Sequence, residues 1–577
     1  MSGTPDALRA ACDPKPLSDV EGWTLGRFCD AIGARFGRLP ALVAADHTVS
    51  SNELRRWTYA GMLHDVHALQ WGLLDAGLTA GERVGVMISS VPEWVLHLFA
   101  VTRLGAIFLP INTRFRDREL EHVMAHSGSC MLIAMGRYLG HDHAATIAAV
   151  RSRLPALRTL IGVRGRLGTS PSRRLGANLV ESVAEIDSEA LFRRGRELLA
   201  ERGTPPCADD TRATALLFYT SGTTSFPKGV PLTHANLLPH SVRAGALLDL
   251  QPGEKVLSLY PFFGISGGAN KVLSTFGAGA ALVFQDAFRA QEACDLLTAE
   301  QCSVIHGVDV HIREMVAVQK QRKAGMQPDR RATIAFTAGV DEPLVREMGD
   351  TLGIRRFSHP YGMTETNPMI LRNALDDPFE ACLKPGGRIA PTVEVRVVDP
   401  ETGTERAVGQ EGEIVVRGPT VVREYYNDPE ATSAAFRDGW FHSGDLGVRT
   451  QEGFVFYVGR LKDMLKVGGF NVAPQEVESF LRTHADVLDV AVTGAPDARL
   501  GEIPVAFVQL KPDAQAAPEA LMASCRAHLA NFKVPRAVYV VDALPYHTAA
   551  HGAKLQRHVL REWARARARD DRAFEES

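Results

Sequence analysis

Residues 220–228 read Thr-Ser-Gly-Thr-Thr-Ser-Phe-Pro-Lys, and Gly229 follows them directly. The apolar run 213–219 in front of this stretch is typical of a buried strand, which would open into a loop of small hydroxyl residues and glycines. Gly222 and Gly229 let the backbone turn where a side chain would clash. Hydroxyls and free backbone N–H groups can then surround phosphate oxygens, and Lys228 adds a compact positive charge. The loop therefore predicts a phosphate site; it is not a Walker loop, because Gly229 stands where that loop has Ser or Thr.

Strand-like and helix-like segments alternate along most of the chain. One example is a strand over 83–89, a helix over 92–104 and a strand over 106–110. Alternation of this kind is typical of parallel or mixed sheets covered by helices. A chain of 577 residues is also too long for one ordinary core, so we expect an α/β protein with two to four domains or subdomains.

The pattern changes near Lys462. An alternating strand over 453–458 precedes it, and the predicted elements that follow are helices over 474–484 and 518–529 and strands over 487–493, 503–510 and 537–541. We therefore expect a large N-terminal domain over residues 1–461 and a small α+β C-terminal domain over residues 462–577. The Arg-rich tail 561–577 predicts a solvated or frayed end, and the Gly-, Ser- and Arg-rich segment 163–178 predicts an exposed loop.

Composition narrows the class of protein and its surroundings. The net charge of −3 gives no reason to expect nucleic acid as a partner. The eight cysteines contain no Cys-x-x-Cys pair, which favours a reducing compartment. The N-terminus lacks the pattern of a secretory signal, and the apolar stretch 91–111 carries Glu93, His97 and Arg103, which argues against a membrane span. We expect a soluble cytoplasmic protein, either a monomer or a homodimer.

The stretch 219–230 resembles the signature of the adenylate-forming superfamily, which includes acyl-CoA synthetases, aryl-CoA ligases, luciferases and nonribosomal adenylation domains. Ser225 stands where that family usually has glycine. The resemblance implies that ATP is bound by the loop residues Thr220, Ser221, Gly222, Thr223, Thr224 and Lys228. Several further motifs follow in the order of the family.

Residues 361–365, Tyr-Gly-Met-Thr-Glu, resemble the second core motif of the family. The resemblance implies that Tyr361 stacks on adenine, that Thr364 contacts the α-phosphate and that Glu365 coordinates Mg²⁺, with Gly362 and Met363 completing the motif. A hard carboxylate oxygen suits Mg²⁺. Upstream, Gly339, Val340 and Asp341 occupy the place where the family lays backbone along adenine, although Asp341 could also cap a helix.

The nucleotide's ribose has a predicted ligand in the sequence Trp-Phe-His-Ser-Gly-Asp over 440–445. It resembles the Thr-Gly-Asp motif, with Ser443 in place of Thr. By this resemblance Asp445 accepts hydrogen bonds from both ribose hydroxyls, a task for which a carboxylate is suited, and Arg460 reaches the ribose or a phosphate.

The predicted C-terminal domain carries the remaining family motifs. Lys462 aligns with the hinge about which that domain swings, and Gly468 and Gly469 match the acyl-CoA synthetase form of the loop that lines the pantetheine channel. Lys554 matches the catalytic lysine, which would neutralise charge as a carboxylate attacks ATP. Ala553 replaces the usual glycine before this lysine, and the run from Leu544 is about three residues longer than in the family.

The acyl pocket is predicted near Phe263, Gly264, Gly268, Asp309 and His359. Many relatives have His at the position of Gly264, so its loss, with glycines nearby, predicts space for a bulky, hydrophobic or long acid; the alternative is that the glycines only turn the backbone. Asp309 stands where relatives often have Pro and could meet a polar group on the acid or face water.

Other histidines show ligand-like spacing: His122 with His126, His141 with His143, and His547 with His551. None has an obvious third ligand, so we expect exposed faces rather than metal sites.

Together these features predict an AMP-forming acid:CoA ligase. It would use ATP and Mg²⁺ to convert a carboxylic acid into an acyl-adenylate and then transfer the acyl group to coenzyme A. Alternatives are an acid:AMP ligase that loads a carrier protein, a degenerate nucleotide-binding homologue and, more remotely, a light-emitting oxygenase.

Overall fold

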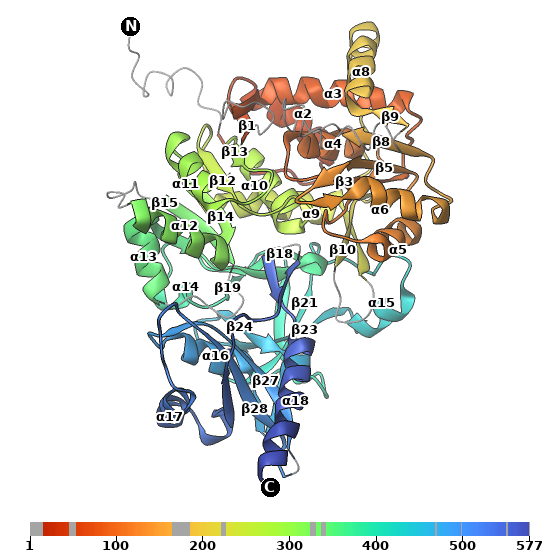
Figure 1. The fold of residues 1–577 in the computed structure, drawn as a ribbon. Helices are drawn as coiled ribbons and strands as arrows, with labels where there is room; N and C mark the ends of the chain where they lie inside the picture. The colour runs from red at the N-terminus through yellow and green to blue at the C-terminus, as the bar shows by residue number, and fades with distance from the viewer. Residues whose placement is uncertain are drawn as a thin grey trace, which may run out of the picture.

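The computed structural model describes residues 15–45, 54–163, 185–220, 227–322, 330–335, 342–467, 470–497, 499–549 and 552–575. Three large sheets occupy the chain up to residue 460, and a smaller sheet with its own helices follows (Figure 1). The C-terminal segment, blue in Figure 1, lies at the opposite end of the molecule from α8 (Ser188–Arg202).

The first sheet carries the phosphate loop at its edge. Its strand order is β11-β10-β4-β3-β5-β8-β9, parallel in the central strands with an antiparallel β11. The strands are β3 (Arg83–Met87), β4 (Ile107–Pro110), β5 (Met131–Met135), β8 (Thr159–Val163), β9 (Ile186–Asp187), β10 (Thr214–Thr220) and β11 (Lys228–Thr233). The accompanying helices are α3 (Tyr59–Asp75), α4 (Pro92–Arg103), α5 (Asp117–Ser127), α6 (His143–Val150) and α8; a small ribbon of β6 (Arg137–Tyr138) and β7 (His141–Asp142) and the short η1 (Arg151–Arg153) lie beside them.

The second sheet also has seven strands, in the order β16-β15-β14-β12-β13-β1-β2, and is parallel apart from β2. The strands are β1 (Pro40–Ala45), β2 (Leu54–Thr58), β12 (Lys255–Ser258), β13 (Ala281–Phe284), β14 (Val304–Val308), β15 (Arg330–Ala335) and β16 (Ile354–Ser358). Its helices are α2 (Leu25–Phe36), α9 (His234–Ala246), α10 (Val272–Gly277), α11 (Ala290–Ala299), α12 (Asp309–Arg322), α13 (Glu342–Leu352) and the π-helical η2 (Ile265–Lys271).

An antiparallel third sheet carries the motif strands of the predicted adenylate site. It runs in the order β17-β18-β19-β24-β23-β21-β20, and β22 pairs with β23. Its members are β17 (Tyr361–Met363), β18 (Asn367–Arg372), β19 (Gly386–Ile389), β20 (Glu394–Val398), β21 (Glu411–Arg417), β22 (Phe436–Arg437), β23 (Trp440–Arg449) and β24 (Val455–Arg460), with η3 (Thr364–Thr366), α14 (Phe379–Cys382) and α15 (Pro429–Ala435) in the connections.

The C-terminal segment folds around an antiparallel sheet to which β29 adds in parallel. Its elements are η4 (Leu461–Asp463), β25 (Leu465–Val467), β26 (Phe470–Val472), α16 (Pro474–Arg482), β27 (Val487–Asp497), β28 (Gly501–Leu510), α17 (Pro518–His528), η5 (Asn531–Lys533), β29 (Ala537–Val540), the hairpin β30 (Tyr546–Ala549) and β31 (Gly552–Leu555), and α18 (Arg557–Glu575).

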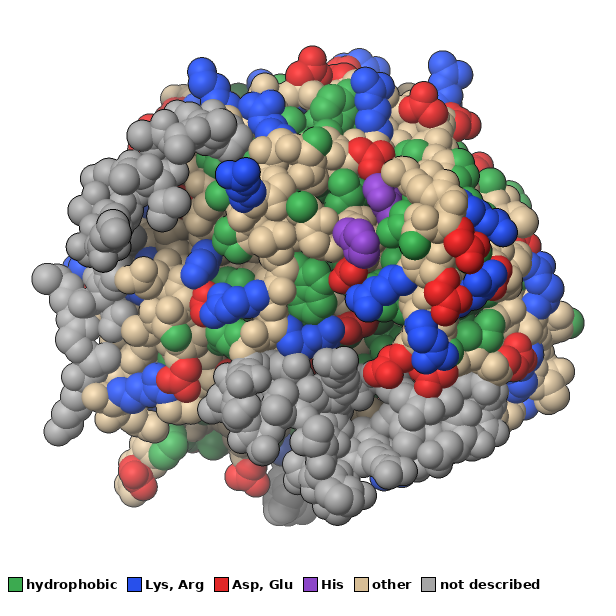
Figure 2. Space-filling model, turned by 90° about the horizontal axis from the view of Figure 1, so that it is seen from above, with side chains coloured by type: hydrophobic (Ala, Val, Ile, Leu, Met, Phe, Trp, Pro, Cys, Tyr) green, Lys and Arg blue, Asp and Glu red, His purple; other side chains and the backbone are tan. Residues whose placement is uncertain are grey.

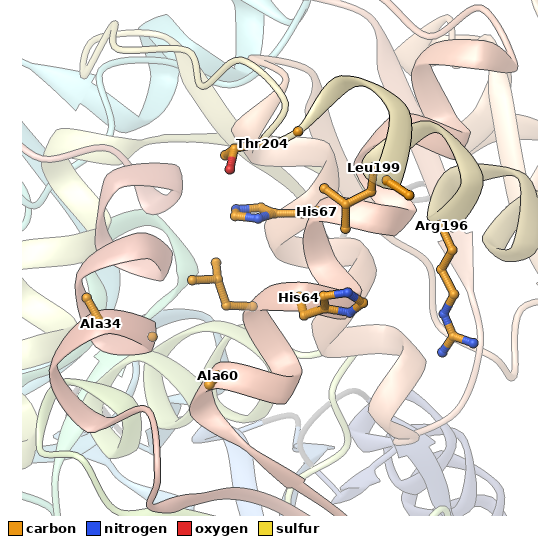
Figure 3. Close-up of a pocket in the computed structure, with 11 residues that line it drawn as sticks. Ala34, Ala60, His64, His67, Arg196, Leu199 and Thr204 are labelled. Carbon is orange, nitrogen blue, oxygen red and sulfur yellow. The ribbon is translucent and has the colours of Figure 1, made fainter.

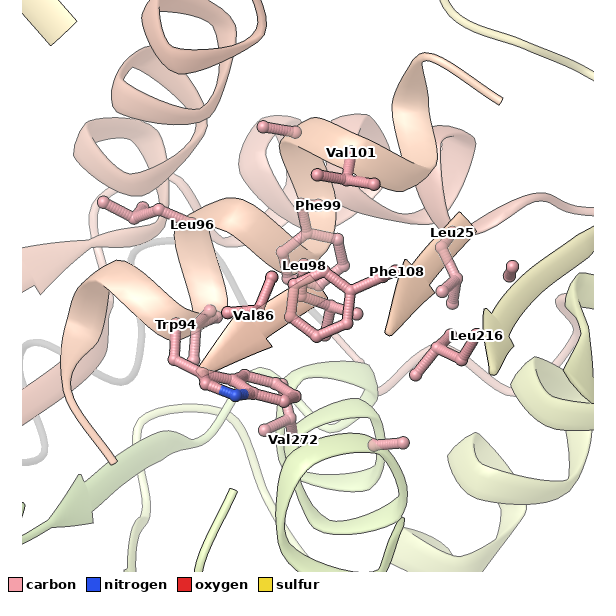
Figure 4. Packing of buried hydrophobic residues seen from close by; sticks show 14 of the residues in the cluster. Leu25, Val86, Trp94, Leu96, Leu98, Phe99, Val101, Phe108, Leu216 and Val272 are labelled. Carbon is pink, nitrogen blue, oxygen red and sulfur yellow. The ribbon is translucent and has the colours of Figure 1, made fainter. Parts of the chain in front are cut away.

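Helix α4 lies in the largest hydrophobic core, between the first sheet and α10 (Figure 4). Trp94 on α4 packs edge-on against Phe108 of β4, with 4.9 Å between ring centroids, and also contacts Phe262. The same core takes in residues of the second sheet, including Leu282 and Phe284 of β13. One core therefore joins the first and second sheets, and it fixes the position of the strand ends of one sheet relative to those of the other.

These elements confirm the predicted α/β class, and most boundaries agree within a few residues. The expectation for the tail was wrong: α18 covers most of it, with Leu560 and Ala564 buried and Trp563 packed edge-on against Phe507. Burial of an apolar stripe stabilises this helix despite its many charges. The predicted loop 163–178 lies almost entirely outside the described residues.

Charged side chains of both signs are interspersed on the face that Figure 2 shows. Among the helices of the described residues, none combines the length and the apolar character that crossing a membrane requires.

Candidate adenylate-forming site

The phosphate loop connects two antiparallel strands. Thr220, the last residue of β10, pairs with Lys228, the first residue of β11. Gly229 follows in β11, where an added Cβ would lie 3.1 Å from the Cβ of Tyr426 and 3.3 Å from the ring of Tyr219. The backbone N–H of Tyr426 donates to the carbonyl of Gly229 at 2.8 Å. Glycine at 229 therefore lets two tyrosines clamp the base of the loop.

A tyrosine outside the recognised motifs joins Lys228 to Glu365. The ammonium of Lys228 lies 4.8 Å from the centroid of the Tyr425 ring, and the Tyr425 hydroxyl donates to Glu365 Oε1 at 2.9 Å. The carbonyl of Glu365 accepts the backbone N–H of Val422 at 2.9 Å. The loop around 422–425 thus contacts both Glu365, the predicted metal ligand, and Lys228, the predicted phosphate-binding lysine.

Glu365 is a buried carboxyl group, and Thr364 beside it is buried as well. Burial raises the pKa of Glu365, while the Tyr425 hydroxyl and the charges of Arg460 and Lys228 lower it. Burial destabilises the ionised form of this carboxyl group, and a cation bound beside it would stabilise that form.

A second cluster joins the predicted adenine and ribose contacts. The Tyr361 hydroxyl donates to Asp445 Oδ2 at 3.0 Å, and its ring stacks on Tyr457 with a centroid separation of 5.6 Å. Asp445 on β23 is paired in register with Arg460 on β24, whose Nε lies 3.3 Å from Asp445 Oδ1. Burial raises the pKa of Asp445 to about 6, against the opposing effect of Arg460. The sequence motifs at 361 and 445 therefore meet in space.

Ser443, which stands where the resembled motif has threonine, holds the backbone beside Asp445. Its hydroxyl donates to the carbonyl of Ile414 at 2.6 Å and accepts the backbone N–H of Asp445 at 3.1 Å. The substitution thus keeps the backbone of Asp445 anchored.

Two histidines of α5 contact the hairpin of β10 and β11 that carries the predicted phosphate loop (the phosphate hairpin). His126 Nδ1 lies 2.7 Å from the hydroxyl of Tyr219, and His122 Nε2 lies 3.1 Å from the carbonyl of Pro227. Both are half-buried instead of fully exposed, and the described residues hold no group of three or more His, Cys, Asp or Glu side chains arranged for a metal. Their i, i+4 spacing on α5 therefore serves contacts with the loop.

The residues of the predicted acyl pocket have mixed surroundings. Gly268 is tightly packed, since an added Cβ would lie 1.8 Å from the carbonyl oxygen of Phe262; this packing accounts for the glycine without an acyl group. Phe263 is half-buried and Gly264 is buried at the start of η2. Asp309 begins α12, and burial raises its pKa while Arg313 and Arg482 lower it. His359 is fully buried, with its backbone N–H on Asn373 Oδ1 at 2.7 Å.

The link between the N-terminal sheets and the C-terminal segment is held by arginines of α18. The carbonyl of Lys462 accepts from Arg561 Nη2 at 3.0 Å, and Asp463 lies 3.5 Å from Arg557 and 3.6 Å from Arg561. Lys554 lies on β31, where its backbone is paired with His547 of β30. The lengthened run before Lys554 thus builds a hairpin.

Several predicted residues fall outside the described part of the chain. They are Ser221, Gly222, Thr223, Thr224, Gly339, Val340, Asp341, Gly468 and Gly469, together with Ser225. Their roles stay predictions.

A surface pocket of about 570 Å³ lies far from these motifs in the fold, between α2, α3 and α8 (Figure 3). His64, His67 and Arg196 line it, and His67 contacts Asp30, which also pairs with Arg103. None of the residues predicted for the adenylate site lines this pocket.

Comparison with known proteins identifies two family models that match this chain. Residues 31–426 match the family model described as AMP-binding enzyme, and residues 476–550 match the AMP-binding enzyme C-terminal domain. The predicted boundary at Lys462 falls between the two matches.

Two curated relatives span nearly the whole chain. A putative acyl-CoA synthetase, YngI, of Bacillus subtilis (strain 168) is 30% identical over 553 residues, which cover 93% of this chain and 96% of the relative. A Mycobacterium tuberculosis protein named 3-[(3aS,4S,7aS)-7a-methyl-1,5-dioxo-octahydro-1H-inden-4-yl]propanoyl:CoA ligase is 32% identical over 516 residues, 89% of this chain and 96% of that protein.

Among solved structures, ATP-bound MatB from Rhodopseudomonas palustris is similar, with a TM-score of 0.75 and 26% identity over 93% of this chain and 98% of that one. The chain belongs to the AMP-binding enzyme family and, within it, to the acyl-CoA synthetases.

Proposed function

We propose that this protein is an AMP-forming acid:CoA ligase whose adenylate site is built from the two clusters described above. The observation that carries this proposal is their convergence. Lys228, Tyr425 and Glu365 form one connected group, and Tyr361, Asp445 and Arg460 form the other. The charge of Arg460 also acts on Glu365, so the two groups share one electrostatic environment.

In the first half-reaction, the substrate carboxylate attacks the α-phosphorus of ATP and pyrophosphate leaves. Two anions must approach each other, so the protein's task is to position them and to screen their repulsion. Lys228 holds phosphate oxygens at the hairpin, Asp445 holds the ribose hydroxyls, and Lys554 brings a further positive charge to the reacting groups.

Glu365 fits the ligand role for Mg²⁺. One of its oxygens accepts the Tyr425 hydroxyl, which orients the carboxylate. Its raised pKa reflects burial, a cost that a bound divalent cation would relieve. Magnesium supplies charge neutralisation on the phosphates when it is bound.

In the second half-reaction, the CoA thiolate displaces AMP from the acyl carbon. Lys554 is no longer required, whereas the loop at Gly468 and Gly469 lines the entry of CoA. A rotation of residues 462–577 about Lys462 exchanges the two arrangements. The contacts of Arg557 and Arg561 with Asp463 lie directly at this hinge and would have to adjust as it turns.

The acid is proposed to be bulky or long. The Mycobacterium tuberculosis relative is named for a propanoyl group on a two-ring system, which supports a substrate larger than a short fatty acid. The carrier-protein alternative keeps the same first half-reaction and differs only in its acceptor.

A panel of carboxylic acids with ATP and Mg²⁺ tests this proposal when AMP and pyrophosphate are followed with and without CoA. We expect AMP release to depend on both the acid and CoA and to match acyl-CoA formation. Pyrophosphate release with acyl transfer only to a carrier protein would support the alternative acceptor. Formation of ADP in place of AMP would contradict both.

A further inference from the structure

A row of polar side chains crosses the second sheet in its interior. Ser258, His306, Thr333 and Ser358 occupy one register row on β12, β14, β15 and β16. All four are buried, with relative exposures from 0 to 3%. Ser358 donates to the carbonyl of Asn373 at 3.0 Å. The hydroxyls of Ser258 and Thr333 and both ring nitrogens of His306 lack hydrogen-bond partners within the described part of the chain.

Lys271 is a buried lysine at the end of η2. Its ammonium has the Met369 sulfur 3.0 Å away, which is a weak acceptor, and the side chain is almost fully buried. Its charge acts on His306, and the charge of Arg372 acts on Lys271. Burial lowers the pKa of Lys271 to about 7.

Lys271, His306 and Arg372 form a cluster of basic side chains, and several of their hydrogen-bond donors have no strong acceptor among the described residues. Arg372 is buried on β18, and its Nη1 finds no partner among the residues that the structure describes. Across those residues, no carboxylate contributes to the pKa of Lys271, His306 or Arg372. Buried charges are normally paired, and buried donors are normally satisfied, so such a cluster indicates a missing anion.

Both elements that border the predicted acyl pocket continue into this cluster. Lys271 closes η2, which begins directly after Gly264, and His306 precedes Asp309 by three residues on β14 and α12. Three strand residues span roughly 10 Å. His306 therefore lies about 10 Å along β14 from Asp309, a separation that a medium-length acyl chain can span.

Strand β18 links the cluster to the adenylate motif. Met369 lies four residues after Glu365 and has a φ of +71°, in the left-handed region that bulky side chains rarely adopt. Asn367 has a φ of +64°, and its amide donates to the carbonyl of Thr420 at 2.7 Å. Backbone strain held in place by buried hydrogen bonds is typical of functional sites. In this conformation the Met369 sulfur lies 3.0 Å from the ammonium of Lys271.

We infer that Lys271, with His306 and Arg372, binds a second carboxylate at the far end of the acid, so that the enzyme activates dicarboxylic acids at one end only. This inference rests on the proposed function and names its substrate class. The sequence predicted a bulky, hydrophobic or long acid. The inference changes this expectation: the acid would carry a second carboxylate at the end opposite to the one that is activated, and the chain between the two carboxylates would lie among apolar residues. The second carboxylate takes no part in bond formation.

The test compares acids of equal length with one or two carboxyl groups: hexanoate with adipate, octanoate with suberate, and decanoate with sebacate. CoA-dependent AMP release is measured for the wild-type protein and for Lys271→Met, which keeps the length of the side chain and removes its charge. We expect at least one diacid to exceed its matched monoacid tenfold or more in kcat/KM with the wild type, and this preference to be lost or reversed in Lys271→Met. Lys320→Met, at an exposed lysine on α12, is the matched control and should behave as the wild type.

A thermal-shift measurement with AMP and the same acids provides a second readout that needs no turnover. A diacid should raise the Tm of the wild type and of Lys320→Met but not that of Lys271→Met. If none of these six acids releases AMP, the thermal shifts alone decide the fate of the cluster, and the proposed function fails only if the wider panel of acids also releases no AMP. A preference for monoacids in turnover, or equal diacid effects on the wild type and Lys271→Met in both readouts, would overturn the inference.

Discussion

Tyr425→Phe isolates the hydrogen bond that joins the phosphate-binding side of the site to Glu365. The change removes the hydroxyl that donates to Glu365 Oε1 at 2.9 Å and keeps the ring that lies 4.8 Å from the Lys228 ammonium. Glu365, the proposed metal ligand, would lose its orientation, whereas Lys228 would keep its aromatic neighbour. The effect should therefore fall on the adenylation step.

The size of this effect follows from the charge of the acceptor. A hydrogen bond to a charged group contributes about 1.5–3 kcal/mol. At 1.36 kcal/mol for each factor of ten, adenylation should slow by roughly 10- to 150-fold. Tyr425→Leu should cost a further ~0.5–1 kcal/mol or more, because it also removes the cation–π contact of Lys228.

Acid-dependent pyrophosphate release measures the first step, and CoA-dependent consumption of supplied acyl-AMP measures the second. Tyr426→Phe is the matched control, because within the described residues the Tyr426 hydroxyl makes only a long contact of 3.5 Å, with the carbonyl of Ser127. We expect Tyr425→Phe to slow the first step and to spare the second, and the control to leave both unchanged. A Tyr425→Phe protein within twofold of the wild type in adenylation would refute the role of this contact.

Three further predictions concern the reaction, the ribose ligand and the tail. Lys554→Ala should slow adenylation far more than thioesterification of supplied acyl-AMP, and equal loss of both would contradict its assignment. Because burial raises the pKa of Asp445 to about 6, its ionisation opposes folding: the stabilisation is present below about pH 4 and is lost as the pH rises through 6. Asp445→Asn should therefore raise the Tm at pH 7.5, with a gap that narrows toward pH 5, and raise KM for ATP about tenfold or more; a lower Tm at pH 7.5 would show that pairing with Arg460 dominates. Leu560→Ala should lower the free energy of unfolding by about 2–5 kcal/mol in denaturant titrations, and a negligible change would show that α18 contributes little.

Predictions of site residues from the sequence were confined to parts of the proposed site that lie within one short segment. The strand, loop and lysine of the phosphate hairpin are consecutive, and residues 361–365 form a single motif, so residue order alone indicates their chemistry. The helix expected over 92–104 was found over 92–103 because Pro92 starts it and apolar residues cover its length.

Contacts between distant segments could not be predicted in this way. Tyr425 reaches Glu365 across 60 positions and His126 reaches Tyr219 across 93, and neither tyrosine nor histidine carries a local signal for its partner. The register row through His306 appears only when four strands are aligned in parallel. For α18 a signal was present, since the buried Leu560 and Ala564 are four residues apart, but the charged composition of the tail obscured it.

The central claim is that the acid is activated as an acyl-adenylate. It is tested most directly with an acid labelled with ¹⁸O in its carboxylate, incubated with ATP, Mg²⁺ and CoA. Attack of the carboxylate on the α-phosphorus must leave one labelled oxygen in AMP after CoA has taken the acyl group. We predict one ¹⁸O atom in each AMP, detected by mass spectrometry. Unlabelled AMP, or label in inorganic phosphate with ADP as the nucleotide product, would contradict the account.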